Sequence, residues 1–151
     1  MLASELIKKY AMETHAEKGL FIETHYPCDG GERPTSGSIY YYVAPGEITG
    51  FHRIDCDEYW IYNAGCTLEI CVVTTDGRVE IRRCGIDEDA EPKVYMEKGE
   101  IFASRLSKEA EDGCFVTCIT VPRFDYSGFE LMDSAALGEI YPEIREFTGN
   151  D

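Results

Sequence analysis

Apolar and polar residues alternate with two different periods along this chain. Leu2, Leu6, Ile7 and Tyr10 recur at the spacing of one helix face, which predicts a short amphipathic helix that lies over the rest of the fold. After this segment the period becomes that of β-strands, in short runs rich in β-branched and aromatic residues. These runs are residues 20–26, 38–44, 48–54, 58–64, 66–74, 78–84, 93–96, 101–107 and 114–121.

Nine such runs in a chain of 151 residues predict an all-β sandwich or barrel. A chain of this length suits one domain over residues 1–151, which buries roughly 68–70% of the surface that its unfolded form exposes. Asp76 and Gly77 stand between two runs and indicate a tight hairpin, because glycine accepts the positive φ that the turn requires. The segment after Ser134 predicts either a short helix or an irregular arm.

The charge of the chain narrows its possible partners. Lysine and arginine number 14, aspartate and glutamate 29, and the formal net charge is −15. A field of this sign repels phosphate backbones and anionic bilayers, so we expect no nucleic acid and no membrane as a partner. Most of the charge serves to keep the surface well solvated.

The cysteines and the first residues indicate a cytoplasmic protein. The start, MLASELIKKYAMETH, lacks the apolar core of a signal peptide, and no later apolar run reaches the roughly 18 residues of a membrane span. The seven cysteines form no CxxC pair and lie largely inside apolar runs. We therefore expect reduced, packed thiols.

One stretch resembles a known motif. The spacing of its glycines, histidine and glutamate resembles the first sequence motif of the cupin superfamily, and the residues concerned are Gly46, His52, Ile54, Glu58 and Gly65. In that motif a second histidine stands at the position of Ile54, and the histidines and the glutamate bind a metal inside a small β-barrel. A later motif aligns with MEKGEIFASRL, where Phe102 occupies the position of another histidine. The resemblance therefore implies an incomplete set of metal ligands.

Four blocks in order narrow the resemblance to the small single-domain, RmlC-like cupins. The blocks are HAEKGLFIETH, SIYYYV, FHRIDCDEYWIYNAG and PRFDYSGFEL, and they span about residue 12 to about residue 132. This resemblance implies a double-stranded β-helix, or jelly-roll, barrel that encloses a pocket and often forms a homodimer. Ala16, Lys18 and Arg123 depart from the usual pattern of the turns in which they lie.

His52 and Glu58 are the candidate catalytic residues. If residues 48–54 and 58–64 fold back as a hairpin, His52 lies near Glu58, and Trp60 and Tyr62 share the face of Glu58. A buried carboxylate beside an imidazole tunes the proton affinity of both groups, as a general acid/base pair requires. The alternative interpretation is a structural pair whose members satisfy each other in the core.

A divalent metal at His52 and Glu58 is a separate hypothesis. Catalytic zinc sites typically use three protein ligands, and the motif supplies two. Cys118, His25 or a tyrosine could be the third ligand. Ile54 and Phe102 make the remaining positions apolar, which suits an organic ring better than a hydrated ion, and we expect no intrinsic cofactor.

Six aromatic residues are candidates for the wall of a ligand pocket, although ordinary core packing explains each of them singly. They are Tyr40, Tyr42, Trp60, Tyr62, Phe102 and Phe124. The resemblance implies a role for His15 at the pocket rim or in a dimer contact, and a place on the free surface without function is the alternative. Asp125 follows Pro122, and we expect it to cap a turn; a contact with a ligand is the second interpretation.

Three functions remain open at this point. The first is a small-molecule-binding enzyme of the epimerase or isomerase kind, in which His52 is the base that moves a proton on a sugar-like or carbonyl-bearing metabolite and Glu58 orients it. The second is a metal-dependent, oxygenase-like cupin, and the third is a metabolite-binding protein without catalysis. Apolar residues on both faces of neighbouring strands favour a homodimer.

Overall fold

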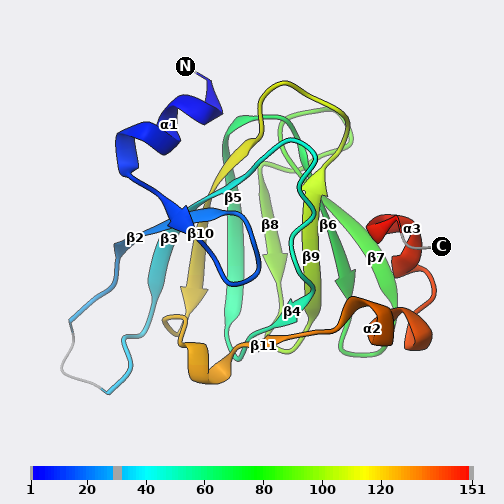
Figure 1. The fold of residues 1–151 in the computed structure, drawn as a ribbon. Helices are drawn as coiled ribbons and strands as arrows, with labels where there is room; N and C mark the ends of the chain where they lie inside the picture. The colour runs from blue at the N-terminus through cyan, green and yellow to red at the C-terminus, as the bar shows by residue number, and fades with distance from the viewer. Residues whose placement is uncertain (1, 29–31, 150–151) are drawn as a thin grey trace.

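Two antiparallel β-sheets packed face to face make up the protein (Figure 1). The computed structural model describes residues 2–28 and 32–149. The larger sheet has six strands, and their spatial order is β1 (Glu13–Thr14), β2 (Leu20–His25), β3 (Gly37–Val43), β10 (Cys114–Val121), β5 (Asp57–Gly65) and β8 (Lys93–Met96). The smaller sheet has five, in the order β11 (Glu130–Leu131), β4 (His52–Arg53), β9 (Ile101–Leu106), β6 (Leu68–Val73) and β7 (Val79–Cys84).

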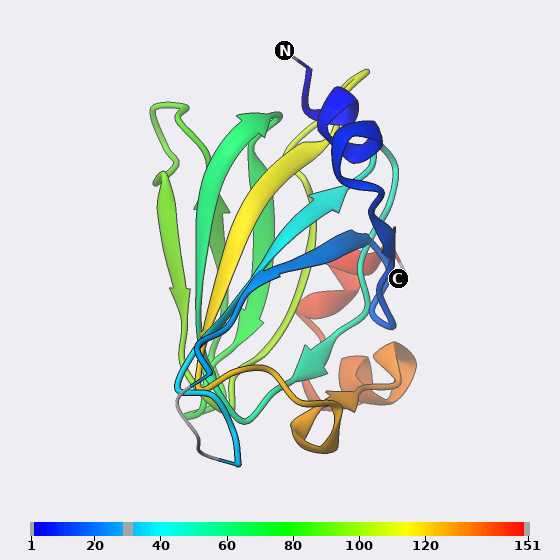
Figure 2. The same cartoon turned by 90° about the vertical axis from the view of Figure 1, so that its left-hand side faces the viewer.

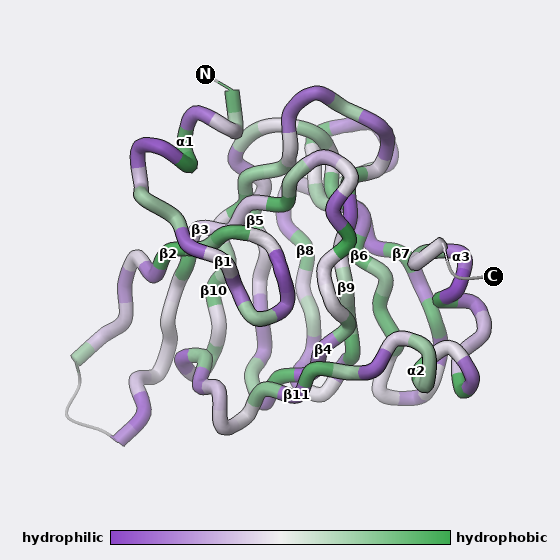
Figure 3. The backbone as a smooth tube through the Cα atoms, viewed as in Figure 1, coloured by the Kyte–Doolittle hydropathy of each residue, from purple (hydrophilic) through white to green (hydrophobic). Residues whose placement is uncertain are grey.

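The predicted all-β class is confirmed, and each of the nine predicted runs contains a strand. Between the sheets lies the main core, which includes Tyr41, Trp60, Ile70, Val72 and Phe102. Every residue of β6 is buried, since one face of this strand lies on the main core and the other lies under the C-terminal segment. The β6 backbone is mostly in the hydrophobic colours of Figure 3, as expected for a strand buried on both faces.

Helices cover the outer faces of both sheets. The C-terminal segment forms α2 (Ser134–Ile140) and α3 (Ile144–Thr148), whose Leu137, Ile144 and Phe147 pack with Cys71 and Val73 of the smaller sheet. Figure 2 shows these two helices behind that sheet. Of the two possibilities for the tail, a helical structure is therefore the one found.

The N-terminal helix α1 (Ala3–Tyr10) lies on the larger sheet, as its apolar spacing predicts. It covers Tyr40, Tyr42 and Phe115 on the outer face. Because side chains alternate along β3, Tyr41 points the opposite way, into the main core. The three consecutive tyrosines are thus divided between two clusters.

The expected hairpin between residues 48–54 and 58–64 is wrong. β4 has only two residues and pairs with β9 and β11, whereas β5 pairs with β10 and β8 in the other sheet. Asp55 and Cys56 carry the chain from one sheet to the other. The glycines Gly46 and Gly50 break the strand pattern before His52, and this shortens β4.

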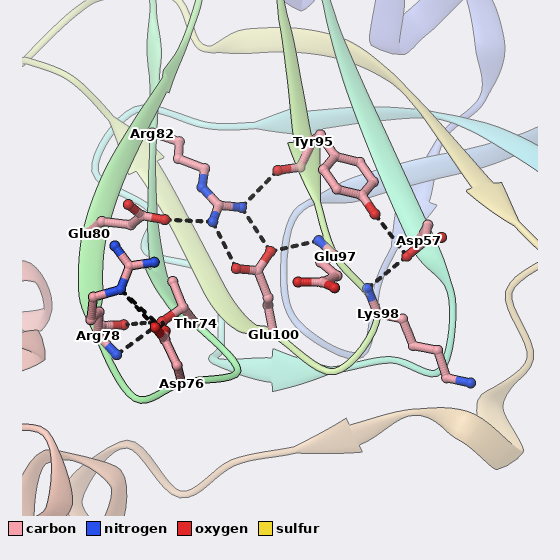
Figure 4. Close-up of polar contacts among 10 residues, drawn as sticks. All are labelled: Asp57, Thr74, Asp76, Arg78, Glu80, Arg82, Tyr95, Glu97, Lys98 and Glu100. Carbon is pink, nitrogen blue, oxygen red and sulfur yellow. Dashed lines mark hydrogen bonds and ion pairs between the residues drawn. The ribbon is translucent and has the colours of Figure 1, made fainter.

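A polar network ties the two sheets together at the β7–β8 side (Figure 4). Arg82 of β7 donates to the carboxylate of Glu100 through two nitrogens, at 2.9 and 2.7 Å, and to the carbonyl of Tyr95 in β8 at 2.7 Å. Glu80 accepts a further bond from Arg82 at 2.6 Å. Both terminal nitrogens of Arg82 already have hydrogen-bond partners. Its role is therefore to hold the two sheets together rather than to bind a ligand.

Two further observations concern the chain as a whole. Within residues 2–28 and 32–149, no helix is long and apolar enough to cross a membrane. All seven cysteines are free, and five of them are buried. The expectation of unpaired, packed thiols is confirmed, with Cys28 as an exposed exception.

Candidate functional site

A cavity of about 450 Å³ lies between the inner face of the larger sheet and strand β4. Its buried wall contains polar groups that sit deep in an otherwise apolar interior, namely His15, Glu17, His52 and Glu58. Ile54 and Cys118 also line it and are buried. Buried titratable groups that converge on one cavity are what a functional site requires.

A tight turn places His15 and Glu17. The amide of His15 donates to the carbonyl of Gly19 at 2.9 Å, and the amide of Lys18 donates to the carbonyl of His15 at 3.0 Å. Gly19 has a φ of 79°, and a Cβ there would lie 2.4 Å from the Tyr41 hydroxyl oxygen, so only glycine fits. Tyr41 donates to the carbonyl of Lys18 at 2.7 Å and fixes the turn against the core.

Glu17 connects this turn to His52. Its Oε2 lies 2.8 Å from Nδ1 of His52, and its carbonyl accepts from the amide of Gly50 at 2.7 Å. The carbonyl of Gly50 lies 2.9 Å from the same Nδ1. Burial alone would lower the pKa of His52, but the Glu17 carboxylate outweighs it, so this pKa lies above its usual value. The carboxylate that tunes His52 is therefore Glu17, where the sequence predicts Glu58.

Glu58 faces the same cavity from the opposite sheet. It lies in β5, paired with Thr120 of β10, and is 8% exposed. Burial raises the pKa of Glu58 to about 7, repulsion by Glu17 adds to the rise, and Trp60 and His52 oppose it. Near neutral pH this carboxyl can both give and accept a proton.

The mouth of the cavity combines charged and aromatic groups. Arg123 forms a two-point ion pair with Glu23, at 2.9 and 2.7 Å, and stacks 3.6 Å over the ring of Tyr26. Phe124 and Tyr126 line the mouth beside it. Asp125 caps the following 3₁₀ turn by accepting from the amide of Ser127 at 2.9 Å, which confirms its capping role.

The structure brings only some of the candidate pocket residues together. Phe124 lines the cavity with His52 and Glu58. Phe102 packs beside His52, with ring centroids 4.3 Å apart, at the position paired with it across β4 and β9. Trp60 is buried in the main core and does not line the cavity, although its side chain acts on Glu58 by lowering the pKa of that carboxyl.

Tyr40, Tyr42 and Tyr62 lie away from the cavity, contrary to their assignment to its wall. Tyr40 and Tyr42 pack under α1 on the outer face, because alternation along β3 turns Tyr41 inward in their place. The hydroxyl of Tyr62 donates to the carbonyl of Gly65 at 2.7 Å, at the far end of β5.

The donor set does not fit a protein-bound divalent metal. Within the described part of the chain no cluster of three or more histidine, cysteine or acidic side chains has the geometry to hold an ion. Nδ1 of His52 already faces two oxygen atoms, which leaves Nε2 as its one free nitrogen, and the other two motif positions hold the buried apolar residues Ile54 and Phe102. Of the suggested third ligands, Cys118 lines the cavity while His25 is exposed at the end of β2.

The structure adds residues to the candidate site that the sequence reasoning missed or left open. Glu17 is the main one, and a local signal for it exists, since it stands two residues after His15 in a glycine-containing turn. His15 is 6% exposed and lines the cavity, which places it at the site rather than on the free surface. The pairing of Arg123 with Glu23 joins positions 100 residues apart, and no sequence pattern marks it.

Comparison with known proteins supports the expected family. Residues 4–132 match the pattern of the cupin superfamily (DUF985), and no curated protein matches the sequence. A crystal structure of a Shewanella oneidensis protein is 29% identical, with a TM-score of 0.87, over 97% of this chain and 94% of that one. A hypothetical protein from Leishmania major is 25% identical, with a TM-score of 0.82, over 95% of this chain and 94% of that one.

A more distant structure shares the fold alone. A variant of oxalate decarboxylase from Bacillus subtilis is 15% identical, with a TM-score of 0.60, and the match spans 79% of this chain but 29% of that one. The jelly-roll arrangement of the two sheets is therefore confirmed.

Proposed function

Because the chain belongs to the cupin superfamily (DUF985), we propose that its cavity binds a small carbonyl-bearing metabolite and moves a proton on it, as an epimerase or isomerase does. One observation carries this proposal. His52 and Glu58, both buried, face one cavity from two different sheets, so a bound molecule would lie between them. Two proton carriers on opposite sides of one carbon are what epimerisation needs.

The protonation of this pair suits the reaction. The pKa of Glu58 is raised to about 7 by burial, and that of His52 is raised by Glu17. The active pair holds one proton, either on Glu58 or on His52. Neutral His52 takes the hydrogen from the carbon beside the carbonyl, and protonated Glu58 returns a proton to the opposite face of that carbon. The reverse reaction starts from the other protonation state, so the rate should follow a bell-shaped pH profile.

The charge of the cavity favours a neutral, sugar-like ligand. Glu13, Glu17, Glu23 and Asp125 line it, and the one arginine among its described lining residues, Arg123, is already paired with Glu23. A phosphorylated or carboxylated ligand would meet repulsion from these carboxylates and from the net charge of −15. Neutral aldoses and ketoses are therefore the compounds to test.

Hydrogen exchange tests the proposal directly. The protein is incubated with neutral aldoses and ketoses in heavy water, and deuterium at the carbon beside the carbonyl is followed by NMR. We expect incorporation by the wild type, and a loss of at least about a hundredfold in His52→Gln and Glu58→Gln, since each removes one proton carrier.

His25→Gln is the matched control, because His25 is exposed and lies outside the cavity. Its exchange rate should equal that of the wild type, and circular dichroism should show that all three variants fold. Binding of a sugar without exchange would contradict an enzymatic role and favour a metabolite-binding protein. Exchange that persists in His52→Gln would remove His52 from the mechanism.

A further inference from the structure

Two histidines of the cavity share one glutamate. Nδ1 of His52 lies 2.8 Å from Oε2 of Glu17, and Nδ1 of His15 lies 3.4 Å from Oε1 and 3.2 Å from the backbone nitrogen of the same residue. Both rings therefore turn their Nδ1 atoms toward Glu17. The Nε2 atoms are the ring nitrogens that remain for a ligand, and the two rings need not present them in the same protonation state.

The contacts of His15 place its proton on Nε2. The backbone amide of Glu17 donates to Nδ1 of His15, so this nitrogen must offer its lone pair. Oε1 of Glu17 is farther away, at 3.4 Å, and could accept from Nδ1 only if Nδ1 carried the hydrogen, which would leave the Glu17 amide without this acceptor. Burial lowers the pKa of His15, and the nearby His52 lowers it further against the pull of Glu17, so the ring stays neutral. Neutral His15 is thus a hydrogen-bond donor at Nε2.

The contacts of His52 place its proton on the other nitrogen. Its Nδ1 faces the carbonyl oxygen of Gly50 at 2.9 Å and Oε2 of Glu17 at 2.8 Å, and neither oxygen can donate. Nδ1 must therefore carry a hydrogen. When His52 is neutral, its Nε2 holds a free lone pair and accepts a proton.

We propose that His15 is a third catalytic residue, whose Nε2–H donates to the carbonyl oxygen of a neutral α-hydroxycarbonyl compound while His52 acts on the adjoining carbon. This assignment rests on the proposed function and names its substrate class. Glu17 is the positioning residue, because its backbone amide selects the tautomer of His15 and its carboxylate, together with the carbonyl of Gly50, faces Nδ1 of His52. The Nε2–H of His15 is a donor for the carbonyl oxygen. The Nε2 lone pair of neutral His52 accepts the hydrogen of the neighbouring carbon, which also carries the hydroxyl group.

The surroundings of His15 strengthen such a donor. Its ring contacts Phe21 at 4.8 Å, Phe124 at 5.8 Å and Phe129 at 6.1 Å between centroids. Water is largely excluded there, so a hydrogen bond to developing negative charge is worth more than in solution. When His52 takes the hydrogen from carbon, the electron pair of the C–H bond moves toward the carbonyl oxygen, and the Nε2–H of His15 stabilises the charge on that oxygen.

Proton–nitrogen NMR of isotope-labelled histidine rings tests the tautomers without any substrate. The chain has three histidines, so each ring can be assigned, and exposed His25 is an internal reference. We expect the Nε2–H form at His15 and an Nδ1 proton at His52. In Glu17→Gln the tautomer of His15 should persist, because the backbone amide remains, while the pKa of His52 should fall. Glu13→Gln, in the same cavity but absent from the described polar partners of both rings, should change neither tautomer. An Nδ1–H form at neutral His15 would overturn the proposal.

Binding tests the ligand class. Dihydroxyacetone carries the required group, and glycerol has the same carbon skeleton without the carbonyl. Dihydroxyacetone should shift the signals of His15 and bind about tenfold more weakly to His15→Phe, as expected for one lost hydrogen bond. His15→Gln should restore much of the affinity, because its amide still donates. Equal shifts with glycerol, or unchanged binding by a folded His15→Phe, would overturn the assignment.

The two proposals fail in different ways. If dihydroxyacetone binds through His15 but takes up no deuterium, proton transfer fails and the donor assignment stands. If deuterium is incorporated while His15 carries its proton on Nδ1, the donor assignment fails and proton transfer stands.

Discussion

At the scale of single residues, Glu58 has the most informative environment, because its carboxyl group lies buried between two sheets. Its pKa is raised to about 7 from a usual value of 4.5, chiefly by burial. Between pH 4.5 and about 7 the carboxyl is ionised in the unfolded chain but still protonated in the folded one. The free energy of unfolding therefore decreases as the pH rises through this range. A shift of this size corresponds to on the order of 3 kcal/mol above neutral pH.

Glu58→Gln should therefore be more stable than the wild type at alkaline pH. The variant has nothing to ionise at this position, so the difference in free energy of unfolding should be near zero at pH about 4 and reach about 3 kcal/mol at pH about 8. Urea unfolding across this range measures it. A difference that does not change with pH would mean that Glu58 ionises as an exposed carboxyl does.

The site could be predicted from sequence only in part. His52 and Glu58 follow from the spacing of one motif, and the structure places both at one cavity. The partner of His52 could not be found in this way, since Glu17 lies 35 positions earlier and reaches it through a turn packed on Tyr41. The alternation of side chains along a strand predicts that Tyr41 lies on the opposite face from Tyr40 and Tyr42. It does not predict which of the two faces points into the core.

At the scale of elements, α1 depends on a residue far along the chain. Asp112, in the connection between β9 and β10, accepts from the amides of Ala3 and Ser4 at 2.7 and 3.0 Å. The same carboxylate accepts from the hydroxyl of Tyr42 at 3.3 Å. It therefore acts as an N-cap supplied from outside the helix and seats α1 on the larger sheet.

Asp112→Ala should loosen α1 at a cost of about 1–2 kcal/mol, the usual value of a lost cap. Hydrogen exchange of the α1 amides, together with the free energy of unfolding, measures the effect. Asp133→Ala is the control, because Asp133 caps α2 by accepting from Ala136 at 3.0 Å. That variant should leave exchange in α1 unchanged, and unaltered α1 exchange in Asp112→Ala would refute the role of this cap.

Strands of ordinary length with clear turn signals at both ends could be predicted from the sequence, whereas the strands of two residues could not. Residues 93–96 and 114–121 match β8 and β10 in full, because β-branched and aromatic residues fill them between clear turn signals. β1 and β11 have two residues each and fall below what any period can reveal. The sheet to which β4 belongs is decided by its pairing with Ile101 and Phe102, which a local pattern does not contain.

At the scale of the whole molecule, the β5–β8 end of the larger sheet keeps an uncovered apolar surface. Tyr59 and Tyr95 pack against each other there with tilted rings whose centroids lie 5.1 Å apart, and Tyr95 is 41% exposed. α1 covers the β3–β10 part of this face and does not reach the pair. We propose that a second copy of the chain covers it in a twofold homodimer.

Light scattering at micromolar concentration should give about twice the chain mass of 17.0 kDa. Tyr95→Asp should shift the mass toward one chain, because it places a charge in the proposed interface. Ile86→Asp is the control, since Ile86 is 74% exposed in the loop between β7 and β8 and is not part of the Tyr59–Tyr95 pair. A wild-type mass of one chain would refute the dimer and leave the cavity proposals untouched.

The position of the cavity also determines when during folding it can come into existence. Its walls come from the first strands, from the β4–β5 region and from β10, and β3 joins β10 by pairing Gly37 with Thr120. Bringing together strands that lie so far apart in the sequence costs conformational entropy, and the contacts that offset this cost form only once the strands have met. We therefore expect folding in milliseconds to seconds. A ligand of this cavity should therefore bind only the fully folded chain. The time at which ligand binding appears in a refolding experiment would then report when the last strands pair.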